Sequence, residues 1–249
     1  MLFGLEIFEI EPSNYTDLTK VERENTSLSK IWGYKQEWDA EWANWKEINF
    51  YDLKLEDMDE RAGEIFEKVQ SLEKEERKWK VTEFILEKIR VFRDTLPLIT
   101  DLRDESMRER HWKELRIEVK EDFDENDASF TLEKCFDLQL INHIEKISDL
   151  TMNAKKQLKI EKSLQDIKRM WEEDKATELE MDRPRSRADN EEYYRITGTE
   201  LILTTIEDHS AQLAGFKSSP YYKQFDDKID QWEKNINEIT ETLDLLMQV

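Results

Sequence analysis

The sequence contains 249 residues, of which 59 are acidic and 38 are basic, and its formal net charge is −21. This charge excludes simple electrostatic attraction to nucleic acid or to an anionic membrane surface. Five glycines and four prolines are too few chain breakers for a β-sandwich or a barrel, whereas 39% charged and 38% hydrophobic residues suit amphipathic helices. The composition therefore predicts one or two all-α domains.

The opening segment lacks the pattern of a signal peptide. Residues 1–12, MLFGLEIFEIEP, carry three glutamates within the apolar stretch and have no basic flank. No apolar run approaches the roughly 18 to 20 residues that a membrane-spanning helix needs. The single cysteine, Cys135, can form neither an internal disulfide nor a multi-thiolate zinc site. We therefore expect a reducing, intracellular compartment, with no nucleic-acid or membrane partner.

A first long helix is predicted over residues 14–48, because apolar residues recur there mostly at steps of three, four or seven. Within it, Trp38, Trp42 and Trp45 could form an aromatic binding groove. Their spacings of four and three place them on one face, which favours a helix–helix core. The whole stripe consists of Tyr15, Leu18, Val21, Leu28, Ile31, Trp32, Trp38, Trp42 and Trp45.

A second stripe predicts one helix of roughly ten turns that begins near Leu55 and stops at Pro97. Proline pushes its predecessor toward extended geometry, so we expect Pro97 to form a bend between this helix and the next. The stripe contains Leu55, Met58, Ala62, Ile65, Phe66, Val69, Leu72, Trp79, Phe84, Ile85, Ile89 and Phe92.

Two further helices are predicted on either side of an acidic loop. Residues 107–119 form a short helix, whereas residues 120–129, KEDFDENDAS, match no helical face and are predicted to be a loop. Residues 131–176 then resume the helical spacing as a third long helix. Its stripe contains Ile141, Ile144, Ile147, Leu150, Ala154, Leu158, Leu164, Ile167 and Trp171.

The apolar period changes after Glu178. Leu179 and Met181 alternate with polar residues, and Tyr194 and Ile196 alternate again beyond the breaker-rich run RPRSRADNEE. Alternation on both sides of a turn predicts a small β-hairpin.

Three arginines lie in the predicted hairpin turn: Arg183, Arg185 and Arg187. They could contact an acidic surface on a partner. An exposed turn that keeps the hairpin soluble is the simpler interpretation.

Two helices follow the hairpin. The first carries Leu201 to Leu213 and is predicted to end at Gly215, which suits a left-handed cap. The second has a heptad-like seam, which implies packing against another long helix. No glycine or proline follows Leu246, so we expect a piece of a longer chain. The seam consists of Phe225, Ile229, Trp232, Ile236, Ile239, Leu243 and Leu246. Together these elements predict an all-α, elongated bundle of long amphipathic helices with one small β-hairpin.

Sequence motifs for catalysis are lacking. The glycines, at positions 4, 33, 63, 198 and 215, permit neither G-x-x-x-x-G-K-[ST] nor G-x-G-x-x-G. His111, His143 and His209 are far apart, which favours surface or partly buried imidazoles over metal ligands. Asp208-His209-Ser210 contains triad residue types, but neighbours on one helix point in different directions. We predict no catalytic, cofactor-binding or metal-binding residue.

A calcium-loop pattern is the one local exception. Asp122, Asp124, Asn126 and Glu133 match positions 1, 3, 5 and 12 of an EF-hand loop. Position 6, which needs glycine for a sharp turn, is Asp127. A solvated acidic linker that caps the following helix is the alternative, and ion binding by residues 121–127 stays open.

At residues 96–116, LPLITDLRDESMRERHWKELR, the sequence resembles the N-terminal linker region of dynein heavy chains. Two later blocks, residues 130–173 and residues 218–249, resemble the same family in the same order. The first 95 residues match more loosely, through the FGL opening and a Tyr-x-x-Leu-x-x-Val-Glu pattern that starts at Tyr15. The central block is most similar to axonemal dyneins of the two-headed inner-arm type.

This resemblance implies a tail-proximal helical bundle at 1–95 and the N-terminal part of a linker domain at 96–249, continuing beyond the sequence. It implies a segment that transmits force and is not itself an enzyme, within an ATP-driven microtubule motor of the ciliary or flagellar axoneme. ATP and Mg²⁺ would bind in an AAA+ ring outside this segment. The implied partners are other dynein heavy, intermediate and light chains, and microtubule doublets through the full motor.

Two rival interpretations remain. A spectrin-like or coiled-coil scaffold predicts helices of one length at a fixed period, whereas a linker predicts unequal helices interrupted by a hairpin. A calcium-responsive module is the other. Under the linker interpretation the important residues are structural: Trp38, Trp42, Trp112, Trp171 and Trp232 as packing anchors, and Pro97 as the bend.

Overall fold

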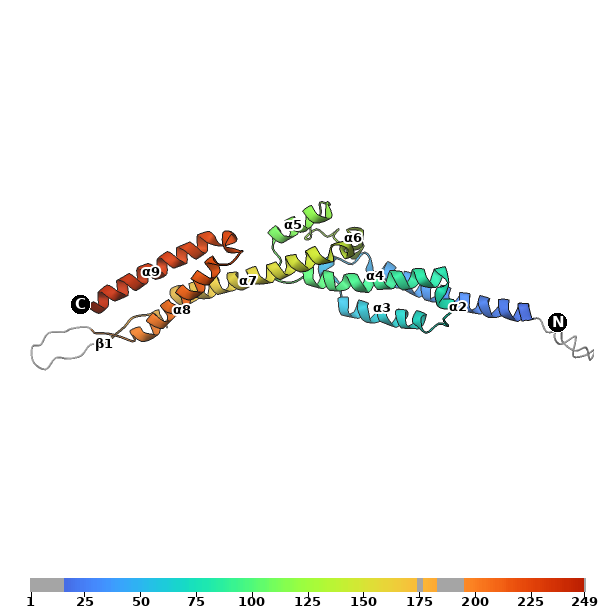
Figure 1. The fold of residues 1–249 in the computed structure, drawn as a ribbon, viewed down its shortest axis with the longest axis horizontal. Coiled ribbons are helices and arrows are strands. Elements are labelled where there is room, and N and C mark those ends of the chain that lie inside the picture. The colour runs from blue at the N-terminus through green and yellow to red at the C-terminus, as the bar shows by residue number, and fades with distance from the viewer. Residues whose placement is uncertain (1–15, 174–176, 183–194, 249) are drawn as a thin grey trace, which may run out of the picture. The chain divides into compact units, whose positions relative to one another are not determined.

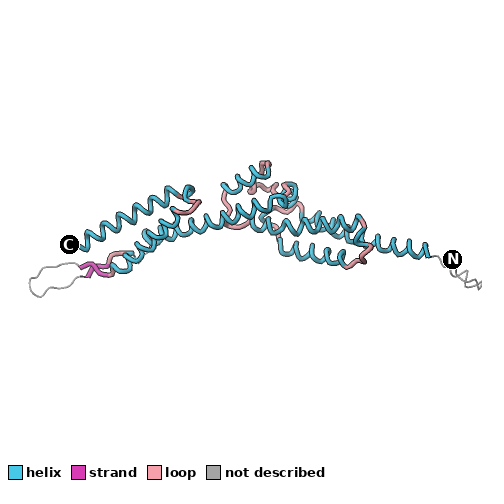
Figure 2. The backbone as a smooth tube through the Cα atoms, in the orientation of Figure 1, coloured by secondary structure: helices cyan, strands magenta, loops and turns pink. Residues whose placement is uncertain are grey.

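A computed structural model describes residues 16–173, 177–182 and 195–248. The chain divides into two compact units, residues 1–151 and 152–249. Within the described ranges it is helical apart from one two-stranded hairpin (Figures 1 and 2), which confirms the all-α class. No described helix is long and apolar enough to cross a membrane. The predicted tail–linker boundary after residue 95 is a different kind of division and stays a prediction.

The first unit is built on three helices that pack against one another. The first, α2, spans Thr16–Trp45, close to the predicted range of 14–48, although residues 14 and 15 lie outside the described part. Its remaining helices are α3 (Leu55–Gln70), α4 (Lys80–Leu102), α5 (Glu109–Val119), α6 (Leu132–Asp137) and the first part of α7 (Ile144–Glu172).

The prediction of one uninterrupted helix from Leu55 to Pro97 was wrong. The chain turns back at residues 71–79, so that α3 and α4 lie side by side. Six consecutive charged residues, 73–78, supply a solvated turn that includes a 3₁₀ segment. Folding back buries the apolar stripes of both halves in one core, which a straight helix would leave in water.

The predicted bend at Pro97 was also wrong. Pro97 lies inside α4, which continues to Leu102. Proline in a helix interior costs about 3 kcal/mol relative to alanine. Burial of the last turns, where Ile99 and Leu102 are at most 2% exposed, outweighs that cost.

The predicted helix over 131–176 is divided in two. Between α6 and α7, Gln139 adopts a left-handed backbone with φ of 49° and a 3₁₀ turn covers Leu140–His143. The break directs Leu140 into the core, where it is 1% exposed. Residues 174–176 lie outside the described part.

A short backbone pairing joins the end of α2 to the start of α6. Phe50 N donates to Phe130 O at 2.9 Å, and Leu132 N donates to Ile48 O at 3.0 Å. Asn49 and Thr131 form the antiparallel bridge between these bonds. We call this pairing the clasp.

The second unit contains the rest of α7, the hairpin, α8 (Thr199–Lys217) and α9 (Asp226–Gln248). The predicted hairpin is confirmed: β1 (Glu180–Asp182) pairs antiparallel with β2 (Arg195–Thr197), and Met181 is opposite Ile196. The predicted turn, with Arg183, Arg185 and Arg187, lies outside the described residues.

The prediction that Gly215 caps the C-terminus of α8 was wrong, and a left-handed glycine lies instead before its N-terminus. Gly215 is inside the helix, which runs on to Lys217 and is followed by Ser218. Gly198 instead precedes the helix with φ of 75°, a conformation that favours glycine, and connects β2 to α8.

The seam of α9 is covered along most of its length. Ile229, Ile236 and Leu243 are at most 3% exposed, and Trp232 is half-buried against the same core, whereas Leu246 is 43% exposed. Helix lengths range from 6 residues in α6 to 30 in α2. Unequal helices with an inserted hairpin are what the linker interpretation predicts, and they contradict the regular period of a spectrin-like scaffold.

Candidate functional site

Phe92 of α4 is the centre of an aromatic seam that ties three helices of the first unit. Its ring contacts Trp38 edge-on at 5.2 Å and stacks on Trp45 at 5.3 Å, between ring centroids. Phe136 of α6 also stacks on Phe92, at 5.6 Å, and Trp42 meets Phe136 edge-on at 5.1 Å. Phe92 is 1% exposed and Trp38 is 7% exposed, and Trp42 and Trp45 pack partly buried against the same helix–helix core. Trp38 and Trp42 also line a cavity of about 560 Å³ beside this core.

A second aromatic cluster holds the acidic loop. Phe123 and Phe130 stack at 5.0 Å between centroids, and Trp112 of α5 meets Phe123 edge-on at 6.2 Å. Phe50, next to the clasp, contacts Phe130 at 5.1 Å. The loop between α5 and α6 is therefore anchored by its aromatic residues, with the charges left around them.

Arg116 of α5 is the polar anchor of the same loop. Its Nη2 donates to Glu125 Oε2 at 2.5 Å, its Nε donates to the carbonyl of Phe123 at 2.6 Å, and its guanidinium lies 5.5 Å from the Phe123 ring centroid. A further bond joins Nη1 to Glu109 Oε1 at 2.8 Å. Glu125 is only 3% exposed, so this ion pair is buried and removal of either partner would strand a charge.

Asp124, Asp127 and Glu133 of the calcium-loop pattern are engaged in other contacts. Asp124 Oδ1 accepts from the backbone N–H of Asn126 at 2.9 Å, and Glu133 Oε1 lies 3.6 Å from Lys46 Nζ. Asp127 accepts from the backbone N–H of Ser129, which lowers the pKa of Asp127. Across the described ranges, no group of three or more His, Cys, Asp or Glu is placed to hold a metal ion.

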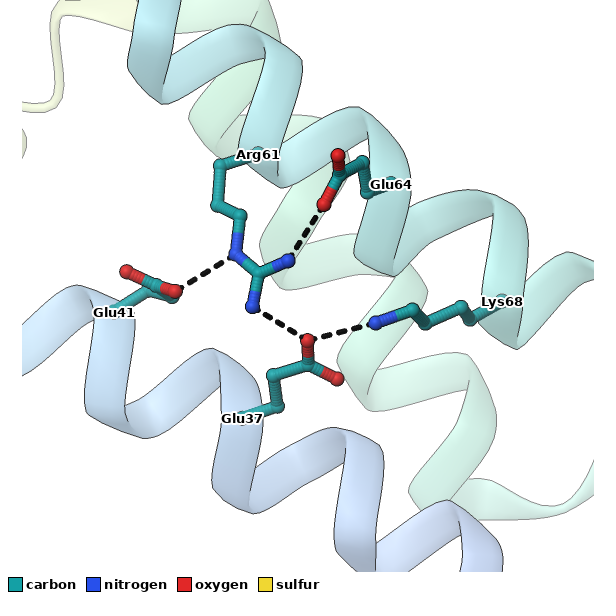
Figure 3. A network of polar contacts seen from close by, with 5 residues as sticks. All are labelled: Glu37, Glu41, Arg61, Glu64 and Lys68. Carbon is teal, nitrogen blue, oxygen red and sulfur yellow. Dashed lines mark hydrogen bonds and ion pairs between the residues drawn. The ribbon is translucent and has the colours of Figure 1, made fainter.

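A charged network, shown in Figure 3, crosses from α2 to α3. Arg61 of α3 donates from Nε to Glu41 Oε1 at 2.8 Å and from Nη2 to Glu37 Oε1 at 2.7 Å. Lys68, two turns along the same helix, donates to the same Glu37 oxygen at 2.8 Å, and Glu64 completes the set at 2.5 Å from Arg61 Nη1. We call these five residues the α2–α3 network.

The network shifts the pKa values of Glu37 and Arg61 in favour of their charged forms. The hydrogen bond from Lys68, together with the positive charges of Lys68 and Arg61, lowers the pKa of Glu37 below its ordinary 4.5. Glu41 and Glu64 raise the pKa of Arg61 through their hydrogen bonds. A guanidinium that bridges two helices restrains sliding of one helix past the other, because its planar fork fixes the position of each acceptor.

The second unit combines neutral hydrogen bonds with an ion-pair cluster, in which Lys217 Nζ of α8 lies 3.0 Å from Asp230 Oδ1 and 2.5 Å from Glu233 Oε2 of α9. Trp171 Nε1 of α7 donates to His209 Nδ1 of α8 at 2.9 Å, and burial lowers the pKa of His209. Tyr221 donates its hydroxyl proton to Asn153 Oδ1 of α7 at 2.6 Å. Both bonds connect α7 to the segment that contains α8 and α9, around a core of aliphatic side chains.

His111, His143 and Cys135 make contacts within the fold. His111 Nδ1 accepts from the backbone N–H of Arg108 at the start of α5, and His143 Nδ1 lies 3.3 Å from Glu118. Cys135 is fully buried, and burial raises the pKa of its thiol to about 12, so it stays a protonated core residue. The absence of catalytic residues from this segment stays a prediction.

Sequence patterns missed Arg61, Arg116 and Glu125. Arg116 and Glu125 are nine residues apart across a loop, and Arg61 lies on a different helix from Glu37 and Glu41. Helical periodicity marks apolar faces and does not pair charges between helices. No signal in one sequence identifies these contacts.

Comparisons with known proteins identify relatives over almost the whole chain. The family model "Dynein heavy chain, N-terminal region 2" matches residues 18–249. Dynein axonemal heavy chain 2 of Homo sapiens is 34% identical over 248 residues, and the dynein-1-beta heavy chain of the flagellar inner arm I1 complex of Chlamydomonas reinhardtii is 35% identical over 246 residues. The dynein alpha chain of the flagellar outer arm of the latter species is 24% identical over 222 residues.

These alignments cover 99%, 99% and 89% of this chain, respectively. In each case they cover 5% of the relative. The chain therefore spans about one-twentieth of the length of the relatives it matches.

Proposed function

This chain belongs to the dynein heavy-chain family, and we propose that it is the force-transmitting tail and linker segment of an axonemal heavy chain. The observation that supports this role most directly is the way α2, α3 and α4 are joined. Phe92 fixes α4 against α2, and the α2–α3 network fixes α3 against α2. Helices joined by rigid rings and bridging guanidinium groups resist bending and sliding better than helices that lie independently.

The parent protein in this proposal is an ATP-driven microtubule motor of the ciliary or flagellar axoneme. ATP and Mg²⁺ act in its AAA+ ring, outside this segment, and the segment itself does no chemistry. The inner-arm assignment is supported by the higher identity to the inner arm I1 chain, 35%, than to the outer arm alpha chain, 24%. Other heavy, intermediate and light chains, and microtubule doublets, are the partners we propose for the complete motor.

Within this scheme we propose residues 1–95 as the tail-proximal bundle and residues 96–249 as the beginning of the linker. Residue 95 lies inside α4, so the two functional parts would share one helix. Shared helices are a direct way to pass torque between neighbouring parts, since bending is resisted by backbone hydrogen bonds.

The proposal is tested by softening α7 in the intact heavy chain. Lys156 and Lys159 are exposed residues of α7 between the last core residue of the first unit, Leu150, and the first of the second, Ile160. Glycine costs about 1 kcal/mol per residue relative to alanine in a helix. The Lys156→Gly/Lys159→Gly double variant therefore weakens α7, and Lys156→Ala/Lys159→Ala is the matched control.

We expect the glycine variant to move microtubules more slowly than the alanine variant, with an unchanged rate of ATP hydrolysis. Hydrogen exchange of α7 amides verifies the softening. Equal gliding velocities of the two variants, with faster exchange in the glycine variant, would show that force does not pass through this helix.

A further inference from the structure

A groove on the outer face of the α3–α4 pair takes no part in the aromatic seam or the α2–α3 network. Its volume is about 780 Å³, and we call it the α3–α4 groove. Its apolar lining comes from Leu55 and Phe66 of α3 and from Leu96 and Pro97 of α4. Pro97 is exposed there, on the solvent side of a helix whose opposite face is core. Clefts of this size are typical of binding sites, and this one combines four apolar residues with a mostly charged lining.

The rim of this groove is acidic. Its carboxylates are Glu56, Asp59, Glu60, Asp94 and Asp101. The two arginines of the lining are already engaged, because Arg93 Nε donates to Asp59 at 2.7 Å and Arg90 Nη1 donates to Glu87 at 3.2 Å. Carboxylates therefore remain in excess around the apolar lining, and an occupant with positive charge would be attracted.

Pro97 also interrupts the helical hydrogen bonding beside the groove. Proline has no N–H, so it cannot donate to the carbonyl of Arg93, four residues earlier in α4. Both residues line the groove.

We propose that the α3–α4 groove docks an amphipathic helix of a partner protein, with an apolar ridge that fills the groove and lysine or arginine side chains that meet its rim. A second copy of the same face would bring two acidic rims together, and an anionic membrane or a nucleic acid would meet like charge. The charge distribution thus selects a basic protein segment.

The first test adds a labelled probe to the intact heavy chain. The probe is an amidated helical peptide of about 18 residues, with leucines at i, i+3 and i+4 spacing and flanking lysines. Fluorescence anisotropy should detect binding, and the Glu60→Lys/Asp94→Lys variant should weaken it by about tenfold or more. A matched control, Glu145→Lys/Asp149→Lys, makes the same charge change on exposed positions of α7 outside the groove and should alter the affinity by less than about twofold.

The same probe with glutamates in place of lysines should fail to bind. Equal affinity of the two peptides, or equal loss in the groove variant and the α7 control, would overturn the proposal.

The second test identifies the natural occupant in the assembled dynein complex. A photo-reactive amino acid replaces Asp94, and cross-linked peptides are identified by mass spectrometry. A cross-link to a helix rich in lysine or arginine supports the proposal. A cross-link to a second copy of this segment, to lipid or to an acidic segment, or no cross-link at all, would overturn it. Neither test measures motility, so each outcome is independent of whether α7 transmits force.

Discussion

The two compact units of this chain are held together in different ways. In the first, aromatic rings around Phe92 and a guanidinium at Arg61 connect the helices. In the second, mainly aliphatic side chains of α7, α8 and α9 form the core, and two neutral hydrogen bonds, Trp171–His209 and Tyr221–Asn153, connect α7 to the rest. Its ion pairs, from Lys217 to Asp230 and Glu233, join α8 to α9 outside that core. Both units show the same helical spacing of apolar residues, yet their cores differ in composition. We therefore expect side-chain truncation, salt and pH to change the stability of the two units by different amounts.

The largest expected effect is loss of the ring at the centre of the first unit. Phe92→Ala removes the contacts to Trp38, Trp45 and Phe136 and should lower the free energy of unfolding by about 3–5 kcal/mol. Hydrogen exchange should report the loss in α2 and α4 and leave α8 and α9 protected. Phe84→Ala, on the same helix but 53% exposed, is the control and should cost less than about 1 kcal/mol. Equal costs would contradict the assignment of Phe92 as the centre.

A smaller loss is expected in the aliphatic core. Ile229→Ala removes a fully buried side chain of α9 and should cost about 2–4 kcal/mol, read as faster exchange confined to residues 152–248. Leu245→Ala on the same helix, 65% exposed, should be nearly neutral. If the Ile229 variant loosens α2 and α4 as well, the two cores are not separate.

The α2–α3 network should contribute less than either core. Arg61→Met removes three carboxylate partners and should cost about 1 kcal/mol at low salt, because the side chain is 35% exposed and its charges are screened by water and ions. Arg90→Met, whose side chain is 57% exposed with one partner, is the control. Denaturant unfolding at low and high salt should show the difference between these variants shrinking as salt rises. A difference that salt leaves unchanged would contradict an electrostatic origin.

The smallest effect is a pH response confined to the second unit. Burial lowers the pKa of His209 from its ordinary 6.5, so its contribution is fully present above about pH 6.5 and is lost as pH falls through the lower folded pKa. We expect the free energy of unfolding to fall by less than about 1 kcal/mol as the pH is lowered. This pH response should be absent in His209→Gln and present in the control His143→Gln. Exchange rates in α8, followed from about pH 7 to pH 5, provide the measurement.

The first unit should respond in a different window. The pKa of Glu37 is lowered, so the stability it contributes is present above pH 4.5 and is lost as pH falls through its folded pKa. If α2 and α3 loosen together with α8 between pH 6.5 and 5, the contrast between the units fails.

The elements that could be predicted are those in which periodicity and burial agree. The seam of α9 and the alternation around Met181 and Ile196 each identified the observed structure. The helix α2 was also identified, but its predicted stripe was partly wrong as a buried face: Ile31 and Trp38 are buried, whereas Leu18, Val21, Leu28 and Trp32 are 37–59% exposed. The resemblance at residues 96–116 identified the family, which the match over residues 18–249 confirms.

The fold-back at residues 71–79 could not be predicted from period alone. Apolar residues on both sides keep helical spacing, and nothing local states that the two halves bury each other. Proline disfavours a helix interior, but burial of the residues after Pro97 keeps α4 helical there. The break between α6 and α7 occurs at Gln139, whose backbone is left-handed although the residue is not glycine, so no glycine signal marks it in the sequence. The charged contacts of Arg61 and Arg116 depend on that packing, so they could not be predicted before it was known.

The clasp would carry part of any pulling force applied between α2 and α7. Its backbone bonds between residues 48–50 and 130–132 close a loop that contains α3, α4 and α5. Pulling on α2 and α7 would load these bonds together with the packing of α3 and α4 against α2, so the clasp shares the tension with the aromatic seam and the α2–α3 network. If the clasp and this packing both opened under an overload, each released residue would lengthen the chain by up to about 3.3–3.6 Å.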